Sequence, residues 1–493
     1  MIHPLLEPGW MQAILPELIL SVGGILLCLV AAFAPRAKEV LAPLALIIFI
    51  ATAWAENLFV RAGDYFGGTY EVSAITLVFD LTFLLAGMLV TLFGRDYLER
   101  ENIEGGEFYA LLMWGTVGMM MMAKGLDLLI VILGLEILSI CIFVLCGYHR
   151  RIAVSNESSL KYFLMGAFAT GFILYGTALF YGATGSTNIG IMAWQFGRMQ
   201  VVTPLTTIAF VLLMAGFGFK LALAPFHAWA PDVYQGAPTP VAGWLSVAPK
   251  AATLIALIRI FHAMAPLLGE GKDTAAKVPW MNMVAVLSML SMIVGNAVAI
   301  VQRDLKRMLA YSGIAHVGYM MIAMLTVRDE SVAAIAVYTI VYALMNIGAF
   351  GVVSLLVKNE NDPHTLDDIA GLGFRRPFYG LALAVCMFSL SGLPPTAGFI
   401  SKFYIFKTAI ESGHTTVALV GILASIISVY YYLRVVYYLY MKEAPEAYAV
   451  EPAGGVFATG ALMIAMVGIM AIGIYPTPLF QAAGEAARRL LEQ

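Results

Sequence analysis

Residues 204–264 read PLTTIAFVLLMAGFGFKLALAPFHAWAPDVYQGAPTPVAGWLSVAPKAATLIALIRIFHAM and place Lys220 and Lys250 inside sequence that is apolar enough for a lipid bilayer. A charged side chain near the centre of a bilayer costs roughly 2.5–3.5 kcal/mol on insertion scales, so each lysine needs a partner, water or a function. As one helix, residues 205–234 would extend about 45 Å at ~1.5 Å per residue and would exceed a hydrocarbon core of about 30 Å. We therefore expect a break one turn beyond Lys220, where Pro225 removes a backbone donor and clashes with the preceding turn.

The composition is that of a membrane protein. Of 493 residues, 61% are hydrophobic and 12% are charged, and a soluble fold could not bury so much apolar surface. The net charge of −3 argues against a nucleic-acid partner, and the sequence has no zinc-ligand spacing or phosphate-binding loop. The four cysteines lie within apolar runs and are expected to be small core residues; they are Cys28, Cys141, Cys146 and Cys386.

Apolar runs of about 17–25 residues predict about fourteen membrane spans, so the expected fold class is an all-α polytopic membrane protein. Two runs are too long for a single helix and contain prolines, which predicts two broken helices. The predicted spans are 11–33, 40–55, 73–94, 107–123, 126–147, 159–182, 203–234, 240–264, 279–301, 308–326, 331–357, 378–411, 415–441 and 454–475.

The loops differ in their content of Lys and Arg. One alternate set is rich in both and includes Arg95, Arg150 and Arg303, whereas the opposite set, to which Lys124 is assigned, is poor. By the positive-inside rule, this bias predicts that both termini lie outside, on the periplasmic side. The first ten residues lack Lys and Arg and lead directly into a span, so we expect neither a signal peptide nor a transit peptide. These features favour a bacterial inner (plasma) membrane over a mitochondrial inner membrane.

A weak internal repeat relates two parts of the chain. The segment YFLMGAFATG (162–171) matches YALMNIGAFG, which begins 180 residues later, at Tyr, Leu, Met, Ala and Gly. The same offset carries Glu136 to His316 and Lys220 to within two positions of Lys402. Each copy contains five spans, an odd number, so the second copy is expected to be inverted in the membrane, as in many secondary transporters.

Four ionisable side chains lie within separate predicted spans. Glu136 is in the middle of its span and is read as a proton-relay acid, the counter-ion of a lysine, or a structural carboxylate. Lys220 is its natural partner, Lys250 follows on the next helix, and Lys402 comes after the second break. Lys220 and Lys250 can alternatively be lysines near helix ends that reach the interface. Three lysines and one glutamate leave an excess of positive charge, which favours proton carriage because some of the lysines must be neutral or hydrated.

Histidines and tyrosines can extend such a relay. His227 and His316 can bridge between lysines because neutral imidazole both donates and accepts, although a structural hydrogen-bonding role is equally open. The tyrosines considered for water wires are Tyr148, Tyr234, Tyr311 and Tyr319. The remaining single charges inside spans, which can equally be structural, are Asp80, Arg259 and Arg434.

Four segments together resemble a known family. They are GLEILSICIFVLCGY (134–148), GFGFKLALAPFHAWAPDVYQGAPTPVAGWLSVAPKAA (216–252), DLKRMLAYSGIAHVGYM (304–320) and LSGLPPTAGFISKFYIF (390–406). They are similar to the antiporter-like membrane subunits of NADH:quinone oxidoreductase, respiratory complex I, and the resemblance covers essentially the whole chain. Lys402 and the lack of a long lateral C-terminal helix resemble the N type rather than the M or L type.

The resemblance implies how the chain is organised. Three helices at 1–106 would precede a first antiporter-like repeat at 107–276 and an inverted second repeat at 277–445. Helix 14 and a C-terminal surface tail would complete the chain at 446–493, and the tail itself, which follows Pro476, can form a short surface helix.

The resemblance also implies a relay. Glu136 corresponds to the family's fifth-helix glutamate, and Lys220, Lys250 and Lys402 correspond to the lysines of helices seven, eight and twelve. His227 corresponds to the linking histidine, and with His316 these residues form the expected proton relay.

The implied activity is proton translocation driven by quinone reduction elsewhere in the complex. The chain has no nucleotide, flavin or iron–sulfur motif, so it is expected to be a non-redox subunit without cofactor or metal. FMN, iron–sulfur clusters and quinone are expected in partner subunits. The expected partners are other membrane subunits of complex I, including adjacent antiporter-like subunits, and the lipid bilayer.

Two alternatives stay open. A subunit of a multisubunit sodium/proton antiporter would share the buried charges and the broken helices, and sodium-dependent transport without NADH or quinone would favour it. A non-pumping structural subunit would use the same charges only to fix helix packing; neutral substitutions would then impair assembly without changing the ratio of protons to electrons. The excess of buried lysines counts against that second alternative.

Overall fold

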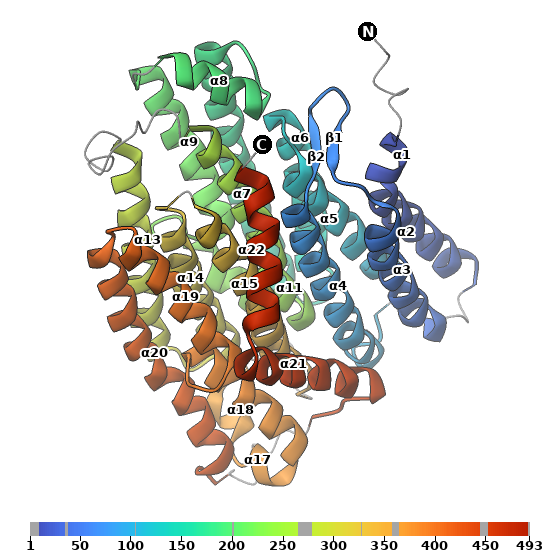
Figure 1. Cartoon of the computed structure of the whole chain (residues 1–493). Coiled ribbons are helices and arrows are strands. Elements are labelled where there is room, and N and C mark those ends of the chain that lie inside the picture. Colours follow the sequence, from blue (N-terminus) through green and yellow to red (C-terminus); the bar gives the residue numbers. More distant parts are fainter. Residues whose placement is uncertain are drawn as a thin grey trace.

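The protein is a helical bundle (Figure 1) in a computed structural model that describes residues 9–34, 38–103, 105–199, 202–264, 279–326, 328–356, 364–443 and 452–491. Its elements in chain order are α1 (Trp10–Ala13), α2 (Leu15–Phe33), α3 (Lys38–Phe59), β1 (Gly63–Tyr65), β2 (Tyr70–Val72), α4 (Ala74–Arg100), α5 (Gly106–Lys124), α6 (Leu128–Cys146), α7 (Ala153–Thr184), α8 (Ile189–Met199), α9 (Pro204–Leu221), α10 (Trp229–Gly236), α11 (Thr239–Met264), α13 (Pro279–Val301), α14 (Leu305–Ala323), α15 (Asp329–Tyr342), the π-helix η4 (Ala343–Ile347), α16 (Gly348–Leu355), the 3₁₀-helix η5 (Leu366–Ile369), α17 (Leu372–Arg375), α18 (Pro377–Ser391), α19 (Ala397–Glu411), α20 (Thr415–Tyr440), α21 (Val456–Ile474) and α22 (Thr477–Leu491).

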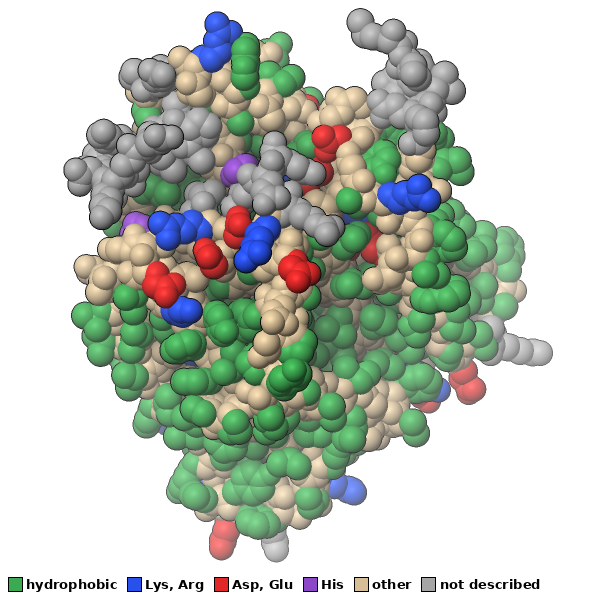
Figure 2. All heavy atoms as spheres, in the orientation of Figure 1, with side chains coloured by type: hydrophobic (Ala, Val, Ile, Leu, Met, Phe, Trp, Pro, Cys, Tyr) green, Lys and Arg blue, Asp and Glu red, His purple; other side chains and the backbone are tan. Residues whose placement is uncertain are grey.

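The helices confirm the expected class of a polytopic membrane protein. Eleven of the described helices are long and apolar enough to cross a membrane. Helices α5 and α14 and the α18–α19 pair pack among them and occupy the positions of three further predicted spans. Figure 2 shows the matching surface, in which apolar side chains form a broad band across the visible face; a group of charged side chains lies above this band and a few lie below it.

Both predicted breaks are present and have the same form. Helix α9 ends at Leu221, and the next residue, Ala222, caps it in the left-handed conformation (φ 57°) before α10 begins. Helix α18 ends at Ser391, and Gly392 caps it in the same conformation (φ 83°) before α19 begins. In each break the peptide bond that precedes Pro225 or Pro395 is cis. The prolines and the span lengths therefore located both interruptions correctly.

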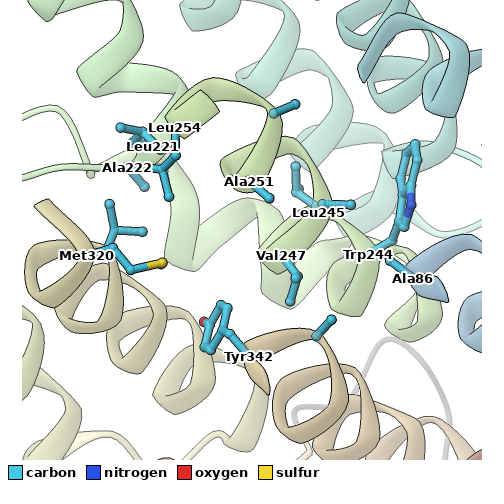
Figure 3. Close-up of a cluster of buried hydrophobic side chains, with 14 of the residues drawn as sticks. Ala86, Leu221, Ala222, Trp244, Leu245, Val247, Ala251, Leu254, Met320 and Tyr342 are labelled. Atoms are coloured by element: carbon cyan, nitrogen blue, oxygen red, sulfur yellow. The ribbon is translucent and has the colours of Figure 1, made fainter. Parts of the chain in front are cut away.

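Helix α11 forms the centre of the bundle. Apart from His262, all of its residues are buried. It packs against α4, α5, α8, α9 and the α15–η4–α16 segment, and Figure 3 shows part of this core, with Trp244 beside Ala86 of α4 and Tyr342 on the opposite side. Lys250 is therefore carried by the most enclosed helix of the molecule.

Three charges near the N-terminal helices are placed differently from the sequence prediction. Lys124 was assigned to a loop, but it is the last residue of α5 and is fully buried. Asp80 lies 2.7 Å from the Lys124 ammonium, and Arg259 forms a 2.7 Å ion pair with Glu71, so neither is a single charge. A lysine at the end of an apolar run resembles a loop residue because its acidic partners are distant in sequence.

The C-terminal segment forms the fifteen-residue helix α22. It packs along α15 and α4 (Figure 1) through a face of small residues that includes Ala483, Ala486 and Ala487. The predicted boundaries between residues 276 and 277 and between residues 445 and 446 lie outside the described residues.

Candidate functional site: a row of buried ionisable side chains

Lys220 lies at the end of α9, one residue before the break, and is held by α6. Its ammonium donates a 2.7 Å hydrogen bond to the hydroxyl of Ser139 and lies 5.5 Å from the centre of the Phe143 ring. The π face of an aromatic ring attracts a cation at this distance. The lysine is only 8% exposed, so its charge depends on these few contacts rather than on water.

Glu136 occupies the turn of α6 that precedes Ser139, but it does not pair directly with Lys220. Its carboxylate accepts a 2.7 Å hydrogen bond from Thr170 of α7. No ion pair within 4 Å joins the two charges, although both are described, so Glu136 acts on Lys220 through space rather than by contact. The expected partnership is therefore an electrostatic interaction between Glu136 on α6 and Lys220 on α9, without direct contact.

Lys250 is almost completely buried on α11 and has no hydrogen-bond partner among the described residues. Its ammonium lies 5.6 Å from the centre of the Tyr234 ring. It also approaches Gly313 of α14, where an added Cβ would lie 3.0 Å from both the Lys250 ammonium and the Tyr342 hydroxyl. The absence of a side chain at Gly313 leaves room for these two polar groups, which face the same point.

A small cavity of about 10 Å³ lies beside Lys220 and reaches toward α11. Its lining includes Ser139, Lys220, Pro249 and Thr253, and the last two residues flank Lys250 on α11. The cavity thus extends from Lys220 to residues of α11 that are close to Lys250 in sequence.

His316 lies on α14 and is bonded at both ring nitrogens. Nδ1 lies 2.8 Å from the hydroxyl of Tyr338, and Nε2 lies 3.1 Å from the hydroxyl of Tyr432. Its ring stacks on Tyr342, with centroids 4.9 Å apart, and Tyr432 also bonds to Ser312. Since a neutral imidazole has one donor and one acceptor, one tyrosine must donate to the ring and the other must accept from it.

Lys402 lies on α19, beyond the second break. Its ammonium donates to the carbonyls of Leu390 and Ser391, at 2.9 and 3.1 Å, and to the hydroxyl of Ser425, at 3.1 Å. It also lies 5.1 Å from the centre of the Tyr319 ring. The last carbonyls of a helix have no intrahelical donor and carry partial negative charge, so the broken end of α18 stabilises a cation.

A larger cavity of about 610 Å³ opens beside Lys402 between α19 and α20. It is lined mainly by apolar side chains such as Phe403 and Ile426, while Lys402 and Ser425 contribute polar atoms. Lys402 itself is only 4% exposed, so it contributes its ammonium to the wall of this cavity while its side chain stays buried.

His227 lies within the first break, between α9 and α10, and is half-buried. Its ring centroid is 6.4 Å from that of Tyr311 on α14. The described residues give its side chain no hydrogen bond to a lysine, so His227 belongs to the break rather than to the chain of direct contacts.

The structure therefore brings several predicted residues into one region and adds others. Tyr234 and Tyr319 lie under Lys250 and Lys402, whereas Tyr148 bonds to Glu107 at 3.5 Å and lies outside the row. Five further side chains contact these groups and were not predicted from the sequence: Ser139, Thr170, Tyr338, Tyr342 and Tyr432. Tyr338 and Tyr342 are four residues apart and so share a helix face, which is a signal that sequence alone contains.

The sequence matches a known protein family and is similar to named members of it. Residues 125–428 match the model of the family described as NADH:quinone oxidoreductase/Mrp antiporter, TM. The NADH-quinone oxidoreductase subunit N of Trichlorobacter lovleyi is 40% identical over 486 residues, which cover 97% of each chain. The NADH-quinone oxidoreductase subunit N 1 of Solibacter usitatus is 38% identical over 496 residues, which cover 99% of each chain.

Solved structures show the same arrangement. A chain of respiratory complex I from Thermus thermophilus with bound aureothin is 34% identical and superposes with a TM-score of 0.80, over 96% of this chain and 99% of that one. A chain of the Mrp complex from a Dietzia species also has a TM-score of 0.80, over 98% of each chain, but at 17% identity this likeness concerns the fold alone.

Proposed function

Because the chain belongs to the NADH:quinone oxidoreductase/Mrp antiporter membrane family, we propose that it is the proton-translocating N-type membrane subunit of NADH:quinone oxidoreductase. The observation that carries this proposal is the row of buried ionisable side chains on separate helices: Lys220 on α9, Lys250 on α11, His316 on α14 and Lys402 on α19. Buried charges in a membrane bundle require a function or a partner, and only some of these have partners.

In this proposal a proton enters from the cytoplasmic side toward Lys220 or Lys250. The charge of Glu136, one turn from the Ser139 hydroxyl that binds Lys220, shifts the balance between the protonated and neutral lysine. Release of the proton from Lys220 leaves a neutral amine, which can then accept the next one. His227, in the break of the same span, provides a second group that can bind and release a proton.

In this proposal His316 transfers the proton between Lys250 and Lys402. Its two ring nitrogens are hydrogen-bonded to the hydroxyls of Tyr338 and Tyr432, whereas Tyr342 stacks on the face of the ring. A proton that comes from the side of Lys250 therefore enters at one nitrogen through the hydroxyl bonded there. A proton leaves from the other nitrogen through the second hydroxyl, toward Lys402. Lys402, held by the carbonyls at the end of α18, is the last station before outward release.

The chain takes no part in the redox chemistry of the complex in this proposal. NADH oxidation and quinone reduction occur on partner subunits, which carry the FMN, the iron–sulfur clusters and the quinone. The partners in the membrane are the other membrane subunits of the complex, including adjacent antiporter-like subunits. The chain lies in a bacterial inner membrane with both termini on the periplasmic side, and residues 107–276 and 277–445 are inverted repeats.

The test is the Lys220→Ala variant in the complete complex. Proton pumping per electron in vesicles driven by NADH is expected to fall while the complex assembles normally. An assembled variant that retains full coupled pumping would rule out this role for Lys220. Co-purification of the chain with flavin and iron–sulfur subunits supports the assignment to complex I, whereas sodium-dependent transport in vesicles without NADH or quinone would favour the antiporter instead.

A further inference from the structure

A second cluster of ionisable side chains lies outside the row just described, among the N-terminal helices. The ammonium of Lys124, at the end of α5, is surrounded by three carboxylates. It lies 2.9 Å from Glu17 of α2, 3.1 Å from Glu56 of α3 and 2.7 Å from Asp80 of α4. Four helices thus each contribute one charge to this acid–lysine quartet.

The quartet is sealed from solvent. Lys124 and Asp80 are fully buried, Glu56 is 1% exposed and Glu17 is 6% exposed. Burial of an ion removes its hydration, at an effective penalty of several kcal/mol per ion, and this is offset only by a well-paired counter-ion. One ammonium offsets one carboxylate, so full ionisation of the quartet would leave two uncompensated negative charges in a dry environment.

The neighbouring cation does not supply the missing charge. Arg259 is already paired with Glu71 at 2.7 Å, and it donates a further hydrogen bond to the carbonyl of Ala123. A further polar neighbour is Tyr70, a neutral phenol that donates a 2.6 Å hydrogen bond to Glu17. A metal ion is excluded from the centre because the Lys124 ammonium occupies it.

The surroundings of the Glu56 and Asp80 carboxyl oxygens indicate that this quartet holds a proton. The Lys124 ammonium reaches one oxygen of each group, Glu56 Oε1 and Asp80 Oδ2. The other two oxygens, Glu56 Oε2 and Asp80 Oδ1, are buried and have no donor within the described part of the chain. Because both carboxyl groups contact the same ammonium, they are close neighbours. Two neighbouring carboxyl groups cannot both be ionised at low cost, and a proton held between them supplies the missing hydrogen bond and removes one charge. The ligand that this geometry fits is a proton.

The quartet also has a connection to the surface through the β-hairpin. Tyr70 and Glu71 are adjacent in β2, and one bonds to the quartet while the other pairs with Arg259. Glu71 lies opposite the exposed residue Asp64 of β1. Arg259 is nine residues beyond Lys250 on α11, which corresponds to about 14 Å at ~1.5 Å per residue. The quartet therefore lies toward the hairpin end of the bundle and away from the lysine row.

We propose that Glu17, Glu56, Asp80 and Lys124 form a second proton-binding site, in which Glu56 and Asp80 share an exchangeable proton. The binding of this proton does not depend on the proposed pumping function, because it follows from the charge balance of the resting protein. The proposal can thus fail or stand independently of the relay.

The test is infrared difference spectroscopy of the purified complex with the amide variants Glu56→Gln, Asp80→Asn and Glu17→Gln. Protonated carboxylic acids absorb at a carbonyl frequency that ionised carboxylates lack and that shifts in D₂O. We expect Glu56→Gln or Asp80→Asn to lose the absorbance of a single protonated carboxyl group. The matched control is Glu71→Gln, which removes an equally buried carboxylate that has its own cation and is expected to leave this absorbance unchanged.

Assembly of the variants adds a second criterion. An amide replaces a protonated acid with little change in shape or charge, so at least one of the Glu56 and Asp80 variants is expected to assemble at the wild-type level. Loss of assembly in all three amide variants would indicate three ionised partners of Lys124 and would overturn the proposal. An unchanged carbonyl absorbance in the variants that assemble would overturn it as well.

Discussion

The ammonium nitrogen of Lys402 lies 2.9 Å from the carbonyl oxygen of Leu390, which belongs to the last turn of the helix on the other side of the break. An unbroken helix would have used that carbonyl for its own backbone hydrogen bond. The interruption at Gly392–Thr396 thus produces the acceptor that allows a lysine to be buried in the membrane. At this site the break in the helix frees the carbonyl that stabilises the buried charge.

Replacement of Lys402 by arginine tests whether this residue must release its proton or need only carry a positive charge. Arginine keeps a cation beside the α18 carbonyls but does not lose its proton in proteins. We expect Lys402→Arg to assemble and to pump fewer protons per electron in NADH-driven vesicles. Lys407→Arg is the matched control, since Lys407 is on the same helix with a half-exposed side chain. Equal pumping by the two variants would contradict a proton-carrying role for Lys402.

Ser139 is expected to support Lys220 through its hydroxyl. Ser139→Ala leaves the buried ammonium without its 2.7 Å acceptor, a loss of about 1–3 kcal/mol for a hydrogen bond to a charged group. The rate of proton pumping should fall severalfold while NADH oxidation by uncoupled membranes changes less. Ser155→Ala provides the comparison, because Ser155 is equally buried but bonds only to a backbone carbonyl. If both serine variants behave alike, the effect is one of packing.

Tyr432 is expected to hold His316 in place and to serve as its hydrogen-bond partner during proton transfer. Tyr432→Phe removes the hydroxyl that bonds to Nε2 of His316 and to Ser312, which frees the imidazole ring at one end. The expected result is slower pumping with an altered pH profile, because the histidine loses one of its two fixed partners. Tyr437→Phe, on the same helix but half-exposed, should behave as wild type. An unaltered pH profile in Tyr432→Phe would argue that this contact is only structural.

The crossing of α5 and α6 is expected to tolerate no added side chain. A Cβ at Gly134 would lie 2.5 Å from the carbonyl oxygen of Gly118, and a Cβ at Gly118 would lie 2.4 Å from the carbonyl oxygen of Gly134. Small residues at such a crossing allow the backbones to approach closely. Gly134→Ala must push the helices apart, and overpacking of this kind typically destabilises by about 1–3 kcal/mol.

We expect a lower temperature of heat inactivation for the complex that contains Gly134→Ala. Gly171→Ala on α7 is the control, since its Cβ would meet nothing within 4 Å and alanine favours the helix. Unchanged heat stability of Gly134→Ala would show that the two helices separate at no cost.

The broken helices and the buried lysines were predictable because both depend on local sequence. The length of an apolar run and a proline inside it are sufficient to predict an interruption, and Lys220, Lys250 and Lys402 are conspicuous among apolar neighbours. The hydrogen-bond partners of these side chains were harder to predict from the sequence. Ser139 and Thr170 are ordinary residues of membrane helices, and their role depends on which helices lie side by side.

The quartet around Lys124 was even harder to predict, because its members are far apart in the sequence. Lys124 ends an apolar run and therefore resembles a loop residue, and its contact with Glu17 joins positions 107 residues apart. The π-helix at Ala343–Ile347 has no local signal either. Its wider turn depends on packing against α11, where Asn346 bonds to Ser246 at 2.6 Å. Long-range pairing of this kind is a property of the assembled bundle.

The enclosure of α11 has a consequence for the biogenesis of the protein. This helix carries Lys250 and Arg259, and each charge disfavours insertion by roughly 2.5–3.5 kcal/mol at the centre of an isolated span. In the finished bundle, Arg259 is paired with Glu71 of the hairpin, and Lys250 lies over the Tyr234 ring. Helix α11 therefore reaches its final environment only after α4, α5 and α9 are present around it, and the order in which spans leave the insertion machinery becomes part of how this fold is specified.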